Sequence, residues 1–218
     1  SLRAIWDCWT NGTPLDYQGE HYQFSLMTPN FTPEPCEYGI PKVQIAAVGP
    51  VMMKVAAEEC DGVMLHAFCT GKYLREVILP RLNKGLENSG RRREDFEISG
   101  GGFVVTGADD EAVSKMFEWV RMRLGFYGST PSYWPVFEQH GWEDLGFKLN
   151  DLSKKGQWEQ MTNEVSDDIV NEFCAVGRFD QITDKIRRRF AGSVDVIAMP
   201  ENTPSDLLEE IRQIGRSL

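Results

Sequence analysis

Four short apolar runs, separated by segments with helical periodicity, constrain the fold of this chain more than any other feature of its sequence. The runs cover residues 43–48, 63–68, 97–106 and 194–199. A nearly continuous apolar run of this length is typical of a parallel strand that is buried on both faces. Strand and helix alternate four times, which predicts an α/β fold with parallel strands and right-handed crossovers.

The residues between the runs give the expected helix boundaries. Pro50 occupies the favoured first position of a helix, and Pro80 is expected to kink the next helix, which ends at Gly90. A last helix begins at Ser205. The expected helices cover residues 50–60, 74–90, most of the long stretch that extends to Ala191, and a final segment from residue 205.

The first forty residues predict smaller elements. Residues 3–9 indicate a helix that is broken by Asn11-Gly12, and residues 15–26 indicate a small hairpin. The Pro-rich passage over 29–41 predicts no regular structure. Two architectures remain open for the rest, an open doubly wound sheet or part of a (β/α)₈ barrel. The chain has neither a G-x-G-x-x-G segment nor a P-loop, so a dinucleotide fold has no sequence support.

The charge balance narrows the classes of partner. The 218 residues carry 23 basic and 33 acidic side chains, a net charge of −10, which disfavours nucleic acid and anionic membrane surfaces. No apolar run approaches the roughly 20 residues that span a bilayer, and no signal-peptide pattern opens the chain. Five scattered cysteines without C-x-x-C spacing indicate a reducing cytoplasm, and three histidines without ligand spacing give no expectation of a metal site.

Two strand ends are candidates for ligand binding. At Ala46-Ala47-Val48-Gly49-Pro50 a strand turns directly into a helix, whose free N–H groups suit a phosphate or carboxylate. An ordinary βα turn is the alternative, and the pattern alone favours it. His66 ends the second strand, where it is expected either to serve a cofactor or substrate or to be a satisfied histidine. Both alternatives stay open.

Other motifs carry weaker signals. Gly100-Gly101-Gly102 lies inside a strand pattern, where glycines mark close packing or room for a ligand. Arg91-Arg92-Arg93 and Arg187-Arg188-Arg189 are expected to be solvated faces. The aromatic stretch 127–134 could wall a substrate pocket or belong to a core or an interface. No catalytic triad can be assigned, which points to chemistry supplied by a cofactor.

A resemblance emerges from an ordered series of motifs. The series begins with Tyr17-Gln18-Gly19-Glu20-His21-Tyr22 and Val43-Gln44-Ile45-Ala46-Ala47-Val48-Gly49-Pro50. It continues with Ala56-Ala57-Glu58, Asp61-Gly62-Val63, Gly90-Arg91 before Asp95-Phe96, Phe126 to Tyr133, His140-Gly141-Trp142, Gly156-Gln157-Trp158 and Ala175-Val176-Gly177. With these motifs the chain resembles the luciferase-like monooxygenase superfamily, and more closely its oxidoreductases that use the deazaflavin coenzyme F420.

The resemblance implies a (β/α)₈ barrel that holds its cofactor at the C-terminal strand ends. The implied cofactor residues are Ala46, Ala47, Val48, Gly49, Pro50, Met64, Leu65 and His66, and Tyr127, Tyr133 and Trp134 would shape the substrate pocket. The implied reaction is hydride transfer between F420 and an organic small molecule. The alternatives are an FMN-dependent monooxygenase and a non-catalytic half-barrel that binds a ligand or itself.

The resemblance also implies a partial barrel. Residues 1–218 correspond to a single domain with about four C-terminal βα units, so the N-terminal half of the barrel and its catalytic residues are expected to be missing, and the isolated chain to be inactive. Strand edges and the inward faces of Ile45, Leu65, Val104 or Val196 would then meet water. A homodimer or higher oligomer that covers this open side is therefore expected.

Overall fold

The computed structural model describes residues 1–34 and 36–216, which divide into two compact units, Ser1–Val43 and Gln44–Leu218. The first unit contains helix α1 (Leu2–Asn11), the antiparallel pair β1 (Tyr17–Gln18) and β2 (Gln23–Phe24), and the 3₁₀ turn η1 (Pro29–Phe31). Gly12 ends α1 in the left-handed region at φ 66°, and its N–H donates to the Cys8 carbonyl. The expected helix and hairpin are both confirmed.

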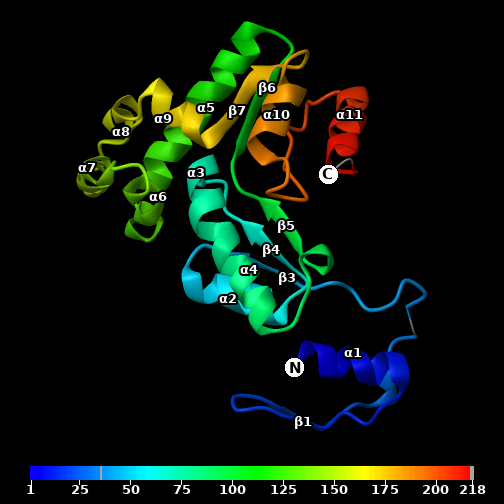
Figure 1. Ribbon diagram of the computed structural model, residues 1–218. Helices are drawn as coiled ribbons and strands as arrows, with labels where there is room; N and C mark the ends of the chain where they lie inside the picture. Colours follow the sequence, from blue (N-terminus) through cyan, green and yellow to red (C-terminus); the bar gives the residue numbers. More distant parts are fainter. Residues whose placement is uncertain (35, 217–218) are drawn as a thin grey trace. The chain divides into compact units, whose positions relative to one another are not determined.

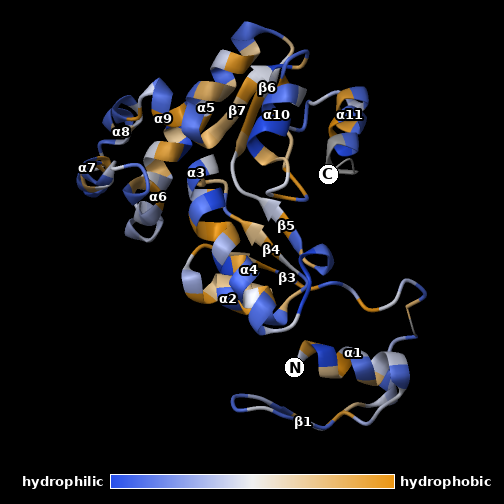
Figure 2. Ribbon diagram, viewed as in Figure 1, coloured by the Kyte–Doolittle hydropathy of each residue, from blue (hydrophilic) through white to orange (hydrophobic). Residues whose placement is uncertain are grey.

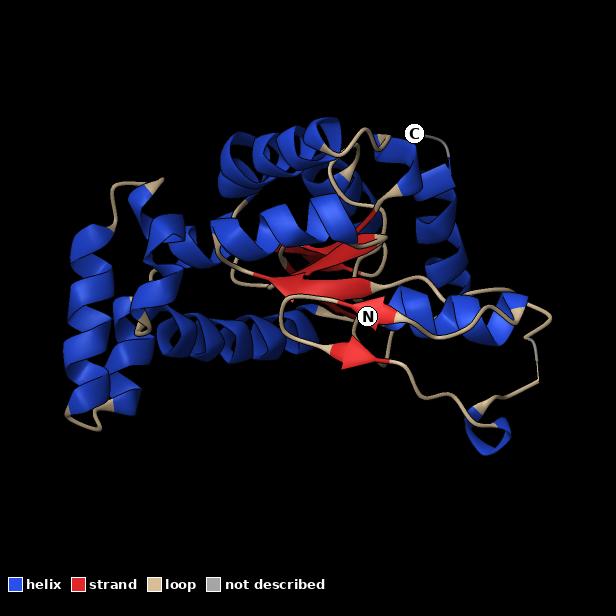
Figure 3. Cartoon of the chain, turned by 90° about the horizontal axis from the view of Figure 1, so that it is seen from below, coloured by secondary structure: helices blue, strands red, loops and turns tan. Residues whose placement is uncertain are grey.

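The second unit is built on parallel strands (Figure 1). Strands β3 (Gln44–Ala47), β4 (Gly62–Leu65) and β5 (Glu97–Gly100) form one sheet in that order, and β6 (Phe103–Gly107) pairs with β7 (Cys174–Arg178). All of these pairs are parallel, which confirms the predicted α/β class. Figure 3 shows the strands next to one another with helices outside them.

Helices follow β3 and β4 as the prolines predict. Helix α2 (Pro50–Glu59) begins at Pro50, and a continuous helix runs through α3 (Gly71–Tyr73), η2 (Leu74–Ile78) and α4 (Leu79–Asn88). Segment η2 is a π-helical turn just before Pro80, where the missing N–H of proline disturbs the regular hydrogen-bond ladder. Gly90, at φ 68°, follows the end of this helix.

A helical layer lies between β6 and β7 in the sequence, although the two strands pair with each other. Its elements are α5 (Asp110–Gly128), η4 (Pro131–Tyr133), α6 (Trp134–Glu138), α7 (Glu143–Lys154), α8 (Trp158–Glu164) and α9 (Asp167–Phe173), while η3 (Arg93–Asp95) precedes β5. Helices α10 (Ile182–Phe190) and α11 (Ser205–Arg216) follow β7. Figure 2 shows hydrophobic and hydrophilic residues together on α5, α10 and α11, as expected for helices that cover a core.

The third and fourth predicted strands need correction. Residues 97–106 are not one strand, because Gly100, Gly101 and Gly102 all have positive φ values, from 85° to 151°, and divide it into β5 and β6. A Cβ at Gly100 would lie 2.3 Å from the Leu65 carbonyl oxygen, so only glycine permits this approach between β4 and β5. Residues 194–199 form a single parallel bridge, Val196 to Ser99, rather than a strand.

Strand β7 lies inside the stretch that the sequence analysis assigned to helix. Its sequence, Cys-Ala-Val-Gly-Arg, has five residues and no clear alternation, so it gives a weak strand signal. Pairing with β6 is what fixes it in an extended form. Here tertiary context decides the structure against a weak local pattern.

The arginine runs are also less solvated than expected. Arg91 donates through Nη1 to the Ala57 carbonyl at 3.1 Å and to the Cys60 carbonyl, while Arg92 is 71% exposed. In the second run Arg187 is exposed, but Arg189 is mostly buried and donates to two backbone carbonyls. Carbonyls left free at chain turns and helix ends attract these guanidinium groups, and sequence spacing alone does not show this.

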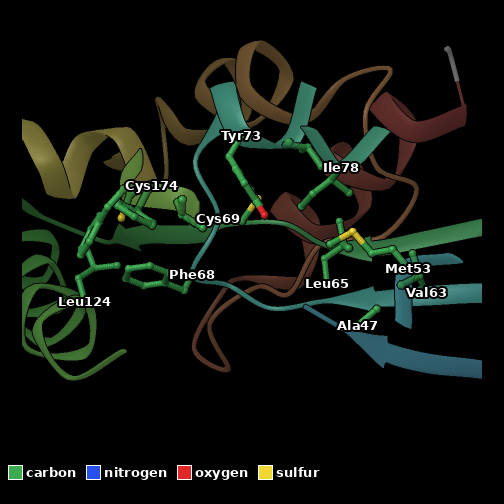
Figure 4. Packing of buried hydrophobic residues seen from close by; sticks show 14 of the residues in the cluster. Ala47, Met53, Val63, Leu65, Phe68, Cys69, Tyr73, Ile78, Leu124 and Cys174 are labelled. Carbon is green, nitrogen blue, oxygen red and sulfur yellow. The ribbon is translucent and has the colours of Figure 1, made fainter. Parts of the chain in front are cut away.

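One large hydrophobic core joins the β3–β4–β5 sheet to α2, α4 and the helical layer. Figure 4 shows part of it, with Ala47, Met53, Val63 and Leu65 close together and Phe68, Leu124 and Cys174 further along the same core. A second cluster holds Val104 and Ala175 against α10 and α11. The core therefore fixes the C-terminal ends of β3 and β4, where the candidate site lies.

Candidate functional site

The turn between β3 and α2 has the form that an anionic ligand group would require. Gly49 precedes the first residue of α2 and is exposed, and a Cβ built on it has no atom within 4 Å. No side chain caps the first turn of α2, in which the N–H groups of Val51 and Met52 have no intrahelical partner. The positive end of α2 and these donors could together accept a phosphate or a carboxylate.

One face of the sheet beside this turn is open. Ala46, Met64, Ser99 and Val196 are successive cross-strand neighbours on this face. Ala46 is exposed, Ser99 is half-buried, and Met64 and Val196 are 47% and 45% exposed. This row is an exposed surface of small and apolar side chains on β3, β4 and β5.

The opposite face of the same strands is buried. Ala47 is 3% exposed and Leu65 is 7% exposed, and both point into the core with Met53 (Figure 4). Successive strand residues alternate between faces, so the eight predicted cofactor residues divide into two sets. The expectation that Leu65 and Val104 are exposed to solvent is wrong, because these side chains are only 7% and 4% exposed. The same expectation for Val196, which is 45% exposed, is confirmed.

His66 follows β4 and lies among aromatic rings. Its Nδ1 accepts a hydrogen bond from the Phe68 N–H at 3.0 Å, so in the neutral ring the proton is on Nε2. The ring contacts Tyr127 edge-on at 4.6 Å and Tyr133 at 4.9 Å between centroids. Burial lowers the pKa of His66, which keeps the ring neutral at pH 7 with Nε2–H as a donor.

The predicted substrate residues separate in space. Tyr127 and Tyr133 both contact His66 and lie 5.9 Å from each other. Trp134 points elsewhere, because its Nε1 donates to the Gly128 carbonyl at 3.0 Å and its ring packs edge-on against Phe147 at 4.8 Å. The structure therefore groups the two tyrosines with His66 and gives Trp134 a packing role between α5, α6 and α7.

The cavity beneath these rings is small. His66, Tyr133, Ala47 and Leu65 line it, and its volume of about 20 Å³ accommodates one water molecule. A coenzyme cannot enter a space of this size. The open sheet face and the β3–α2 turn are therefore the parts of this region that remain accessible to a larger ligand.

A polar pair that the sequence analysis did not identify lies next to the aromatic group. Thr70 is fully buried, and its hydroxyl accepts from the Tyr73 N–H at 3.1 Å and lies 2.8 Å from Nε2 of His140. The pair joins the start of α3 to the α6–α7 connection across 70 residues of sequence. Thr70 immediately before a helix is a sequence signal for an N-cap, but nothing in the sequence identifies its distant partner.

Two further observations concern the described residues only. No group of three or more His, Cys, Asp or Glu side chains among residues 1–34 and 36–216 is arranged to hold a metal ion. None of the helices in that part of the chain combines the length and apolarity that crossing a membrane requires.

Comparisons with known proteins identify the family of this chain. The sequence model of the luciferase-like monooxygenase family matches residues 1–195. An uncharacterized protein of Mycobacterium tuberculosis is 46% identical over 195 residues, which are 89% of this chain and 57% of that protein. A 5,10-methylenetetrahydromethanopterin reductase of Archaeoglobus fulgidus is 26% identical over 216 residues, which cover 96% of this chain and 61% of the reductase.

The fold is similar to that of a solved enzyme. The coenzyme F420-dependent tetrahydromethanopterin reductase of Methanopyrus kandleri superposes with a TM-score of 0.70 at 21% sequence identity, covering 100% of this chain and 60% of the reductase. The chain thus spans about three fifths of the length of the relatives it matches. Because the family's sequence model covers most of the residues, and because this relative shares the fold, the chain belongs to the luciferase-like monooxygenase family.

Proposed function

We propose that this chain is part of an oxidoreductase that transfers a hydride between coenzyme F420 and an organic small molecule. The observation that carries the proposal is the β3–α2 turn, where an uncapped helix start and an open Gly49 adjoin the exposed row Ala46–Met64–Ser99–Val196. The F420-dependent reductase of similar fold supports the choice of coenzyme.

The residues present fit such a coenzyme. The N–H groups of Val51 and Met52 would bind an anionic group of its tail, and the absence of a side chain at Gly49 would allow the tail to approach the backbone. The exposed side chains of Ala46 and Met64 would lie against the ring system. When bound, the deazaflavin supplies the hydride chemistry, and the chain supplies position and proton control.

His66 has the geometry of a hydrogen-bond donor that orients a substrate. The Phe68 N–H holds Nδ1, and burial lowers the pKa of the ring, so Nε2–H can donate to a carbonyl or hydroxyl oxygen of the substrate. Tyr127 and Tyr133 limit the rotation of the imidazole by packing against it. We assign His66 to substrate orientation through a hydrogen bond from its Nε2–H, and the two tyrosines to the wall of the substrate pocket.

We further propose that residues 44–199 form four neighbouring units of a (β/α)₈ barrel. The order β3, β4, β5 and then Val196, with every pairing parallel, supports this arrangement. The open face of the row would then be the barrel interior, and the isolated 218-residue chain would bind coenzyme weakly and catalyse no turnover. An exposed apolar face and the unpaired outer edge of β3 among the described strands favour association with a second copy.

Fluorescence titration with F420 and, separately, with FMN tests the function. We expect weak, saturable binding that is at least tenfold tighter for F420 than for FMN. Gly49→Val should weaken F420 binding through steric block, while Ala108→Val, a matched change just before α5, should leave it unchanged. Tighter binding of FMN would favour a flavin-dependent monooxygenase, and equal affinity of the Gly49 variant and the parent would remove the turn from the site.

A further inference from the structure

In a second accessible cavity, with a volume of about 320 Å³, nearly all of the charged lining side chains are cationic. It lies between the start of α3, the last turns of α10 and the first residues of β7, and it shares no lining residue with the small cavity beneath His66. Its charged lining side chains are Lys72, Arg75, Lys185, Arg188, Arg189 and a single carboxylate, Glu172. The chain as a whole carries a net charge of −10, so this local excess of cations is opposite in sign to the net charge of the chain.

One wall of this cationic groove is a face of α10. Lys185, Arg188 and Arg189 are spaced i, i+3 and i+4, so they occupy the same side of the helix, where like charges repel. Arg187 on the same helix is paired with Asp184 at 2.5 Å. Lys185 and Arg188 have no ion-pair partner among the described residues, and Glu172 is the single carboxylate in the lining of the groove.

The other wall is the start of the helix that continues from α3 through α4. Lys72 and Arg75 lie in its first turns, where the helix dipole disfavours cations. Lys72 donates through Nζ to the Gln139 carbonyl at 2.7 Å, and Arg75 has no hydrogen-bond or ion-pair partner within residues 1–34 and 36–216. Stabilisation of a helix C-terminus can account for arginines at the end of α10, but it cannot account for these two residues.

Arg189 lies at the base of the groove and is held in place. Its Nη1 donates to the Glu172 carbonyl and its Nη2 to the Cys69 carbonyl, each at 2.8 Å. Its Nε is buried and has no partner in the described part of the chain. Burial lowers the pKa of Arg189, and the charge of Arg75 adds a smaller lowering.

We propose that the cationic groove binds the phosphate group of a small molecule. A phosphate monoester carries about −1.5 to −2 charges and three strong acceptor oxygens, so it can accept from both walls at once, whereas a carboxylate is planar and singly charged. Arginine is well suited to bind such anions, because the N–H donors of its planar guanidinium group match the spacing of two phosphate oxygens. The site is independent of the β3–α2 turn, and it holds whether or not the chain uses F420.

Isothermal titration with inorganic phosphate at constant ionic strength tests the proposal. We expect saturable binding with about one site per chain, weakened at least tenfold in Arg75→Gln/Arg188→Gln. Both side chains are exposed, so the folded state should persist, which circular dichroism can verify. Arg92→Gln, a change of an exposed arginine outside the groove, is the matched control and should bind as the parent does.

The proposal is overturned by absence of phosphate binding in the parent protein, or by equal affinities in the parent and the double variant. Citrate is the comparison anion, since it offers carboxylates in place of a phosphate. Tighter binding of citrate than of phosphate would assign the groove to polycarboxylates and refute the phosphate assignment. Because F420 is absent from every arm, failure here does not affect the proposed coenzyme site.

Discussion

Substitution of Gly85 by alanine should destabilise the protein, although alanine is the better helix former. Gly85 lies in α4, and a Cβ built on it would be 2.7 Å from the Cβ of Ala57 in α2. Carbon atoms pack at about 3.5–4.0 Å, so the two helices would have to separate by roughly 1 Å. Ala57 is fully buried beneath α4, and its Cβ cannot rotate away.

The expected magnitude follows from two opposing terms. Gly→Ala in a helix stabilises by about 1 kcal/mol through backbone propensity. Overpacking a rigid core contact costs about 1–3 kcal/mol, and the short distance between two methyl positions places Gly85→Ala near the upper end. We expect the free energy of unfolding to fall by about 1–2 kcal/mol, measured by urea denaturation with circular dichroism at 222 nm.

A compensating substitution isolates the contact. Ala57→Gly alone should cost about 2 kcal/mol, from lost helix propensity and lost burial of one methyl group. In the double variant the methyl group moves from one helix to the other, so the free energy of unfolding should return to within about 1 kcal/mol of the parent. The two substitutions together then cost about 2–3 kcal/mol less than the sum of their separate effects, which is the coupling energy of the contact. If Gly85→Ala alone stabilises the protein by about 1 kcal/mol, the close packing of α2 on α4 is refuted.

Three further outcomes are expected. Arg91→Met should lower the free energy of unfolding by about 2–3 kcal/mol, because Arg91 donates to two carbonyls near the end of α2. Arg92→Met should change it by less than about 0.5 kcal/mol. Similar urea midpoints for these two variants would contradict this expectation. Thr70→Val should lower the free energy of unfolding by about 1–3 kcal/mol, since it removes a helix cap and a buried hydrogen bond. A Tm equal to that of the parent would contradict this. Burial lowers the pKa values of His66 and His140 in the folded protein. As the pH is lowered below about 6.5, the unfolded chain therefore takes up protons first and the free energy of unfolding decreases. Urea midpoints that increase when the pH is lowered from 7.5 to 5.5 would refute this sign.

Local chemistry predicted the first half of the second unit well. The apolar run before Gly49 and the proline after it fixed the β3–α2 boundary, and Pro80 marked the helix that contains a π-turn. These features depend on a few residues that are adjacent in sequence. Strand β7 depends instead on pairing with β6, which lies about 70 residues earlier, and the sequence analysis therefore missed it.

The face of each strand was the main limit in predicting the site. In a continuous apolar run such as residues 43–48, the sequence gives no sign of which alternate residues are open. The exposed set includes Ala46 and Met64, and the buried set includes Ala47 and Leu65. A shift of one residue exchanges the two sets, so only the packing of α2 on one face of the sheet decides between them.

Aromatic residues show the same limit at shorter range. Tyr133 and Trp134 are adjacent in sequence, yet Tyr133 packs on His66 while Trp134 bonds to the Gly128 carbonyl. The 3₁₀ turn η4 leads directly into α6 at this point and turns consecutive side chains in different directions. Composition identified an aromatic cluster here, and the backbone turn decided which of its members face His66.

Hydrogen–deuterium exchange with and without saturating F420 tests the central claim most directly, because it locates the coenzyme on the chain. Amides of residues 49–53, at the β3–α2 turn and the start of α2, and those of residues 65–68 around His66 should gain protection, because a ligand over these strand ends excludes water and binds free N–H groups. The cationic groove around Arg188 should show no change with F420. Protection confined to other segments, with residues 49–53 exchanging as in the free protein, would contradict the proposed site.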